Sequence, residues 1–396
     1  GELPAAGAGL RAGRENDRME PGALTLVRME VDLGRLMGNY RFIKGLVPEG
    51  CTVIAVVKAN AFGTGLVPVA RELSGGGCRH FAVATVEEGL ALRAAGIEGD
   101  ILVLGAIPPR FAPFLLDGGL TATCGDLDLA RALGDEAKAR GTSAPVHLKV
   151  DSGMGRIGFL PEEVLPAARE ILSLGAVEIT GIYTHFAAAD EPDLSHARMQ
   201  GAAFLEVTER LEKAGIRVPL RHACSSAATL NLPELHLDAV RCGIFLYGIE
   251  SGYAHHPLLV KPVFEVKSEL TAVRSLPPFH CVGYNLRYVT RGDARIGVVP
   301  VGFKDGFLRG TKNAEVLVRG HRVPVVGSIC MDQLMVDLAA APEAERGDEV
   351  VLIGRQGGEE ITAMEYARRW DTIPASFMTI FPPRVERVYK NGKTIS

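Results

Sequence analysis

Residues 52–65 read Thr-Val-Ile-Ala-Val-Val-Lys-Ala-Asn-Ala-Phe-Gly-Thr-Gly, an apolar run that ends in a lysine and enters a small-residue loop. Similar β-rich runs alternate with segments of helical apolar spacing between about residues 30 and 250. Eight such runs occur, and they are Thr52–Val57, His80–Thr85, Ile101–Gly105, Leu120–Cys124, Val146–Asp151, Ile179–His185, Leu220–Cys224 and Val240–Tyr247. Eight βα units over roughly 220 residues predict an α/β fold, a (β/α)8 TIM barrel.

The pattern of residues along the sequence changes after about residue 255. Strand-like runs separated by Gly, Pro and Asp turns predominate there, with little helical pattern before Met364–Trp370. The sequence therefore predicts a flexible N-terminal tail over residues 1–27, a barrel over 28–254, and a mostly β C-terminal domain over 255–396. The first strand of the barrel segment is a candidate for pairing with the β domain.

Composition narrows the functional classes. The 396 residues carry a net charge of -4 without blocks of like charge, so nucleic acid and membrane surfaces are not expected as partners. Seven cysteines are scattered singly, which favours a reducing compartment over a disulfide scaffold. The chain shows neither an apolar run long enough to span a membrane nor a signal-peptide core. We therefore expect a cytoplasmic protein.

The carboxyl ends of barrel strands carry active sites, which makes Lys58 the first candidate. A lysine that closes a buried strand has a lowered pKa, because burial disfavours its charged form, and it can then act as a nucleophile that forms a Schiff base. The alternative is a lysine whose charged end reaches solvent. Among the next strand ends, Arg156 follows a glycine-rich turn and could bind a carboxylate, or could simply lie on the surface. His185 is as compatible with a structural role as with a functional one.

The last two strand ends suggest a phosphate site. Barrels often bind phosphate with the loops after strands seven and eight, and Ser226 with the amides of Gly243 and Ile244 would suit this role. The serine could equally cap the next helix. Arg241 lies inside an apolar strand and needs a partner, since a buried unpaired charge is very costly. Together these residues fit an anionic aldehyde cofactor better than a metal, because no His, Cys and carboxylate cluster has ligand spacing.

From about residue 28 to residue 389 the sequence closely resembles the alanine racemase family, whose members are pyridoxal 5′-phosphate (PLP) enzymes with a (β/α)8 barrel followed by a β domain. Five stretches carry the resemblance in order: residues 55–61, His147–Gly158, Thr184–Phe186, Arg241–Gly248, and Gly327–Leu338 with its Cys330-Met331-Asp332-Gln333. The resemblance implies a homodimer with shared active sites that interconverts L- and D-alanine.

The resemblance also implies catalytic roles. Lys58 would be the Schiff-base lysine and one catalytic base. Tyr284, in Val282-Gly283-Tyr284, would be the second base, contributed by the partner subunit. Two bases on opposite faces can remove and return the α-proton without turning the substrate over. Arg241 would contact the pyridine nitrogen, and His185 would lie near both Arg241 and Tyr284.

Further roles follow for residues that would bind the cofactor and substrate. The phosphate would be held by Ser226, Gly243 and Ile244. The substrate carboxylate would be held by Arg156 and the Met331 amide. Lys149 matches a lysine that is often carbamylated in the family and that positions the arginine, and Asp332 is expected in a supporting role.

Several positions depart from the family's usual residues. Tyrosine is replaced at Phe62, Phe303 and Ala375, histidine at Thr64, and an access-channel arginine at Ser328. The changes at Phe62 and Ala375 remove hydroxyls that would reach the phosphate, and Ala375 leaves more room beside the substrate.

Three alternatives stay open at this point. The first is a racemase acting on serine or a larger amino acid, favoured by the room at Ala375. The second is a PLP-dependent decarboxylase, against which Arg241 argues because decarboxylation profits from a protonated ring. The third is a non-catalytic PLP-binding protein, which the presence of a β domain and Tyr284 disfavours.

Overall fold

The structure is a computed structural model that describes residues 25–249 and 260–393. The tail expected over residues 1–27 lies almost entirely outside the described residues, and so does the boundary expected between residues 254 and 255. No helix in the described ranges is long and apolar enough to cross a membrane.

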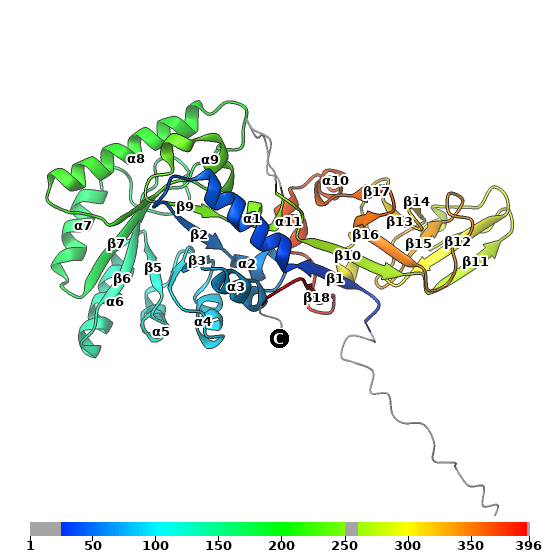
Figure 1. Cartoon of the computed structure of the whole chain (residues 1–396), viewed down its shortest axis with the longest axis horizontal. Coiled ribbons are helices and arrows are strands. Elements are labelled where there is room, and N and C mark those ends of the chain that lie inside the picture. Colours follow the sequence, from blue (N-terminus) through cyan, green and yellow to red (C-terminus); the bar gives the residue numbers. More distant parts are fainter. Residues whose placement is uncertain (1–24, 250–259, 394–396) are drawn as a thin grey trace, which may run out of the picture.

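Eight parallel strands close into a barrel, which occupies one half of the molecule (Figure 1). They are β2 (Thr52–Val56), β3 (His80–Val83), β4 (Asp100–Val103), β5 (Thr121–Cys124), β6 (Ala144–Lys149), β7 (Val177–Tyr183), β8 (Leu220–His222) and β9 (Ala239–Cys242). The barrel predicted from the eight β-rich runs is therefore confirmed. The limits of the other runs differ from those of the strands by one or two residues, but the end of the last run was wrong. It was expected at Tyr247, whereas β9 ends at Cys242 and residues 244–247 form the 3₁₀ helix η3 (Ile244–Tyr247).

Helices cover the outside of the barrel, as the alternating pattern predicts. They are α1 (Leu33–Leu46), α3 (Leu66–Gly75), α4 (Val86–Ala94), α5 (Ala112–Asp117), α6 (Leu127–Arg140), α7 (Val164–Ser173), α8 (Ser195–Lys213) and α9 (Ser226–Asn231), with the 3₁₀ turns η1 (Pro109–Phe111) and η2 (Pro233–Leu235). Helix α6 shows how the sequence sets their limits. Asp126 caps its first turn by accepting from the Leu129 amide, and Gly141 ends it with a φ of 64°.

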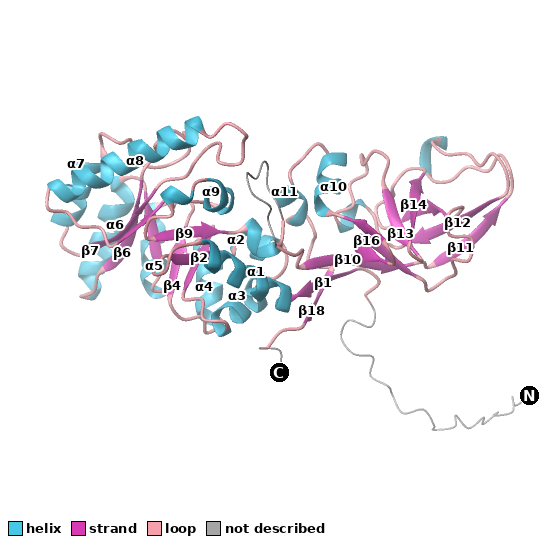
Figure 2. Ribbon diagram, turned by 45° about the horizontal axis from the view of Figure 1, so that its top comes forward, coloured by secondary structure: helices cyan, strands magenta, loops and turns pink. Residues whose placement is uncertain are grey.

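The C-terminal domain is built on a ten-stranded sheet, which extends to one side of the barrel in Figure 2. Its strands are β10 (Phe264–Glu269), β11 (Ala272–Leu276), β12 (Ala294–Val299), β13 (Glu315–Val318), β14 (His321–Val326), β15 (Leu334–Asp337), β16 (Glu349–Gln356), β17 (Glu359–Ile361), β18 (Glu386–Lys390) and, from the start of the chain, β1 (Arg28–Asp32). Strand β1 pairs antiparallel with β10 and parallel with β18. The first and last strands therefore lie side by side.

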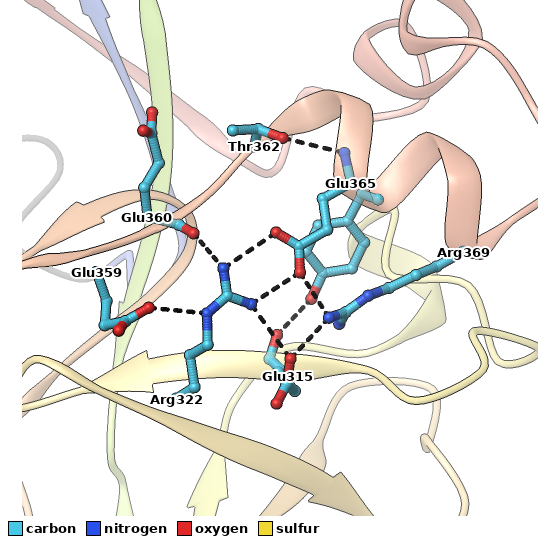
Figure 3. Close-up of polar contacts among 8 residues, drawn as sticks. Glu315, Arg322, Glu359, Glu360, Thr362, Glu365 and Arg369 are labelled. Atoms are coloured by element: carbon cyan, nitrogen blue, oxygen red, sulfur yellow. Dashed lines mark hydrogen bonds and ion pairs between the residues drawn. The ribbon is translucent and has the colours of Figure 1, made fainter.

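Helix α10 (Ala363–Arg369) packs on this sheet through an ion-pair network, shown in Figure 3, and helix α11 (Pro374–Met378) follows it. Arg322 on β14 contacts both carboxylate oxygens of Glu365, at 2.8 and 3.1 Å, and also bonds Glu315 and Glu359. Arg369 bonds Glu315 at 2.7 Å and Glu365 at 2.6 Å. Because these groups are only partly exposed and each is shared, the network fixes α10 to the sheet more firmly than isolated surface pairs would.

An aromatic cluster continues from α10 into α11. The Tyr366 ring stacks on Phe377 at 5.5 Å, and Trp370 meets Phe377 edge-on at 4.7 Å. Phe377 and Tyr366 are fully buried. Their burial fixes the direction of α11, which begins at Pro374 and carries Ala375 at its second position.

Candidate active site

A strained turn follows Lys58 at the end of β2. Residues 59–62, Ala-Asn-Ala-Phe, all have φ between 52° and 55°, so they form one turn of left-handed helix without a glycine. Such a conformation costs roughly 1–2 kcal/mol per residue. The turn is held by Glu88, which accepts from the Asn60 amide at 3.0 Å, and by the Asn60 side chain, which accepts from the Leu66 amide at 2.8 Å. Strain that the surroundings maintain is typical of functional sites.

Lys58 itself is half-buried at the mouth of the barrel. Burial lowers the pKa of its amine, and the nearby charges of Arg156 and Arg241 lower it further, while the carboxylate of Glu88 opposes them. The sequence argument for a nucleophilic lysine rested on burial alone. The structure adds two arginines, which make the neutral amine still easier to form.

Arg241 finds the partners that its place in an apolar strand demands. Its guanidinium contacts His222 Nδ1 at 2.8 Å, the carbonyls of Thr184 and Ala223 at 2.8 and 2.9 Å, and His185 Nδ1 at 3.2 Å. These partners are neutral, so they fix the position of the Arg241 guanidinium but do not neutralise its charge. Since arginine keeps its proton in proteins, this buried end of the site is permanently cationic.

The contacts with Arg241 determine how the histidines are protonated. Arginine can only donate, so the Nδ1 atoms of His185 and His222 must accept. Burial and the charge of Arg241 lower the pKa of His185 to about 2, and both histidines are neutral at pH 7. His222 can then donate from Nε2 to His147 Nδ1 at 2.9 Å, and the Tyr183 ring stacks on His222 at 4.8 Å. Sequence reasoning missed His147, His222 and Tyr183; polar residues inside apolar strands were the available signal.

The corner predicted to hold a phosphate is assembled by the fold. Ser226 at the start of α9 is buried, and its Oγ accepts from the Gly243 amide at 3.0 Å. Ile244 follows directly, at the first position of η3. A Cβ on Gly243 would lie 3.1 Å from the Phe62 ring, so Phe62 packs against this corner. The replacement of tyrosine by Phe62 therefore places an apolar ring beside Gly243.

The loop after β6 carries two more predicted residues. Asp151 shapes it by accepting from the amides of residues 153–155 at 2.8 to 3.0 Å, which leaves Arg156 exposed at its end. Lys149 is buried, donates to the Val150 carbonyl at 2.7 Å, and has its pKa lowered to about 8 by burial and by Arg241. An amine with so low a pKa is partly neutral at physiological pH.

Tyr284 and Met331 lie on the β domain, where their side chains are 62% and 53% exposed. Tyr284 begins η4 (Tyr284–Leu286), in the connection between β11 and β12. The fold thus gathers Lys58, Arg156, His185, Ser226 and Arg241 at the barrel, whereas Tyr284 and Met331 belong to connections of the β domain. Ser328, in place of the family's usual arginine, is buried and donates to the Tyr284 carbonyl at 3.1 Å.

The Met331 loop is anchored by backbone and ionic contacts. The Lys304 amide donates to the Met331 carbonyl at 3.0 Å, within η5 (Phe303–Asp305). Asp332 pairs with Arg384 at 3.2 Å, and Arg384 also pairs with the buried carboxylate of Asp305. These contacts fix the position of the loop, and the supporting role of Asp332 stays a prediction.

The cluster at the barrel mouth suits an anionic ligand. Positive charges of this cluster lower the pKa values of Lys58, Lys149 and His185, which means that these charges are imperfectly compensated. No group of three or more His, Cys, Asp or Glu residues placed to hold a metal ion occurs within residues 25–249 and 260–393. The barrel and this site define a (β/α)8 enzyme built around an anionic cofactor or substrate.

Comparison with known proteins identifies the family. The models "Alanine racemase, N-terminal domain" and "Alanine racemase, C-terminal domain" match residues 31–251 and 263–389. The alanine racemase of Symbiobacterium thermophilum is 43% identical over 92% of this chain and 97% of its own, and that of Desulfovibrio desulfuricans is 40% identical over 91% and 97%. The chain belongs to the alanine racemase family, a family of amino-acid racemases.

Solved structures agree with this assignment. An alanine racemase of Clostridium difficile 630 superposes with a TM-score of 0.88 at 36% identity, covering 92% of this chain and 96% of that one. An alanine racemase of Bacillus anthracis with bound L-Ala-P superposes with the same TM-score at 34% identity, covering 94% and 97%. The expectation of a racemase family with a barrel and a β domain is therefore confirmed.

Proposed function

We propose that this protein is a PLP-dependent alanine racemase with two catalytic bases, Lys58 and Tyr284. The observation that carries the proposal is the incompletely compensated cationic cluster around Lys58, in a chain of the alanine racemase family. The serine-type racemase and the decarboxylase are not favoured, because the relatives are alanine racemases and Arg241 presents a permanent cation.

Three parts of the site would hold the cofactor. Ser226 with the amides of Gly243 and Ile244 would bind the phosphate, Arg241 would face the pyridine nitrogen, and Lys58 would carry the group covalently. When bound, PLP withdraws electrons from the α-carbon and so acidifies its proton. Because Arg241 is fixed by His222 and two carbonyls, its guanidinium would keep its position and its charge beside the bound cofactor.

The remaining residues bind substrate and move the proton. The Arg156 guanidinium and the Met331 amide would hold the substrate carboxylate, with Lys149 beneath Arg156. Lys58 Nζ would take or return the α-proton on one face, and the Tyr284 hydroxyl would do so on the other. Neutral His185, which accepts from Arg241, would lie between this arginine and the tyrosine of the partner subunit.

The proposed function includes a homodimer. In this dimer, Tyr284 and Met331 of a second copy would complete each barrel site. Apolar side chains around Tyr284 support such a contact, since they are unusually exposed in the single chain: Phe279 at 86%, Leu286 at 73% and Val289 at 42%. We also propose a cytoplasmic location, supported by seven free cysteines, four of them buried.

The direct test is racemisation of alanine. The purified protein, saturated with PLP and given L-alanine, should produce D-alanine until the two enantiomers are equal, as read by chiral chromatography. Starting from D-alanine should give the same end point. The proposal would be wrong if neither enantiomer were converted, and release of carbon dioxide from ornithine, lysine or diaminopimelate would favour the decarboxylase instead.

A second prediction concerns the space at Ala375. Ser376 is exposed and Phe377 is buried in the aromatic cluster, so neither neighbour fills the place of the family's tyrosine ring. We expect alanine to be the main substrate and serine to be racemised more slowly. Ala375→Tyr should lower the serine-to-alanine activity ratio about tenfold, within the roughly 1–3 kcal/mol that an apolar wall can discriminate.

The same variant should bind PLP more tightly, also by about tenfold, since a hydrogen bond to a charged group contributes roughly 1.5–3 kcal/mol. Ala375→Phe is the matched control, because it fills the space without the hydroxyl. It should change the substrate ratio but not PLP affinity. If the wild type proved strictly specific for alanine and Ala375→Tyr altered neither quantity, the open pocket would not exist.

A further inference from the structure

We propose that Arg387, on the last strand β18, is a positioning residue that clamps the strained Lys58 turn from within the same chain. The inference rests on the proposed function only in giving Lys58 its catalytic role. It assigns to the C-terminal strand a part in the barrel site of its own subunit, whereas the partner subunit would supply Tyr284 to that site.

Arg387 uses its guanidinium to join two distant segments. Its Nε donates to the Gly63 carbonyl at 3.0 Å, directly after the left-handed turn. Its other nitrogens donate to the carbonyls of Phe381, Pro382 and Val385 at 2.5 to 2.6 Å. All four acceptors are backbone atoms, and burial lowers the pKa of the guanidinium. A half-buried guanidinium whose hydrogen bonds all go to main-chain carbonyls fixes backbone positions and does not neutralise an acidic side chain.

Two further contacts strengthen this clamp. The Tyr389 hydroxyl donates to the Thr64 carbonyl at 3.1 Å. A Cβ on Gly65 would lie only 1.9 Å from that hydroxyl, and a Cβ on Gly63 only 2.3 Å from the Met378 carbonyl of α11. Both glycines have a positive φ, which is 83° at Gly63 and 110° at Gly65. Gly63 therefore lies against α11 and Gly65 against β18, each at a distance that only glycine permits.

Hydrogen bonds hold residues 63–65 in place, because side-chain packing on this side of the Lys58 turn is incomplete. A cavity of about 520 Å³ lies on this side of the turn, and it is lined by Asn60, Leu66, Phe381, Pro383, Arg387 and Tyr389. Glu88 holds the turn from the barrel side. Without Arg387 and Tyr389, the strained residues 59–62 could relax toward the cavity and carry Lys58 with them. A displacement of about 1 Å in a catalytic group can cost about a hundredfold in rate.

Mixed dimers show whether Arg387 acts on the site of its own chain or on the site of the partner chain. A Lys58→Ala chain paired with a Tyr284→Phe chain has one complete site, formed by Lys58 of the second chain and Tyr284 of the first. Arg387→Met should lower kcat at least about tenfold when placed in the chain that supplies Lys58. Placed in the chain that supplies Tyr284, it should change kcat less than about twofold. Equal losses in both arrangements would overturn the proposal.

A readout without turnover tests the same point. In the cofactor-free homodimer, Arg387→Met should speed hydrogen exchange of the amides of residues 59–66 and slow borohydride trapping of PLP on Lys58. Arg355→Met is the matched control, because Arg355 lies on β16 of the same domain and pairs with Glu360 on the surface. Unchanged exchange in residues 59–66, or an equal change in the control, would overturn the proposal.

A second variant and a second measurement distinguish failure of the clamp proposal from failure of the proposed function. If Arg387→Met does not fold, Tyr389→Phe removes only the hydroxyl that bonds Thr64, and it should lower kcat about threefold in the Lys58 chain alone. If the parent mixed dimer has no activity, the shared-site part of the proposed function fails. The clamp is then decided by hydrogen exchange and PLP trapping.

Discussion

Lys58→Ala should abolish alanine racemisation, with a loss in kcat of about a thousandfold or more, because loss of a group that acts as nucleophile and base removes most of the catalysis that depends on it. Borohydride reduction of the wild type should fix the cofactor to Lys58, as read by peptide mapping. Lys44→Ala is the control, since Lys44 is exposed on α1. Recovery of the reduced cofactor on another lysine would refute the assignment.

The lowered pKa of Lys58 gives this prediction a pH dependence. Burial, Arg156 and Arg241 all favour the neutral amine, which is the form that attacks a carbonyl. Attachment of PLP to the cofactor-free protein should therefore already be efficient at a pH well below 10.5, the ordinary pKa of lysine, and should slow as the pH falls through the lowered value. An attachment rate that rose only near pH 10.5 would show that the site does not activate this lysine.

Tyr284→Phe should affect the two directions of racemisation unequally. If Tyr284 is the base for one enantiomer, its removal should slow α-proton exchange from that enantiomer by about 10²–10⁴-fold and affect exchange from the other less. Exchange in deuterated water, started separately from L- and D-alanine, measures the two directions.

Tyr288→Phe is a close control for that experiment. Tyr288 lies four residues along the same connection, but its hydroxyl donates to Asp337 at 2.8 Å within the β domain. Its loss should leave both exchange rates near those of the wild type. Wild-type exchange from both enantiomers in Tyr284→Phe would mean that another group is the second base.

Much of the barrel site could be predicted from the sequence because strand ends converge. Lys58 follows an apolar run, His185 ends one and Arg241 lies within the last one, and a closed parallel barrel brings the ends of its strands to one mouth. The limits of the runs were less certain. The apolar residues 244–247 predict that the last strand continues to Tyr247, but after Gly243 these residues form η3.

Other features had no local signal. Ala-Asn-Ala-Phe carries no sequence mark of a left-handed turn, and the conformation is held by tertiary contacts with Glu88 and Arg387. The contact between Arg387 and Gly63 spans 324 positions, far beyond any periodic pattern. The chain from Arg241 through His222 to His147 likewise depends on which side chains point into the barrel, and this depends on strand register.

The parallel pairing of β1 with β18 also affects how the chain is made. β1 ends at residue 32 and β18 begins at residue 386, so a ribosome completes the barrel strands long before it releases the last partner of the first strand. At about 5–20 residues per second, the growing chain carries β1 unpaired on that edge for roughly 20–70 s. Arg387 is made equally late. The turn at Lys58 is therefore fully clamped only when synthesis is nearly finished, which makes cofactor loading a step that follows translation.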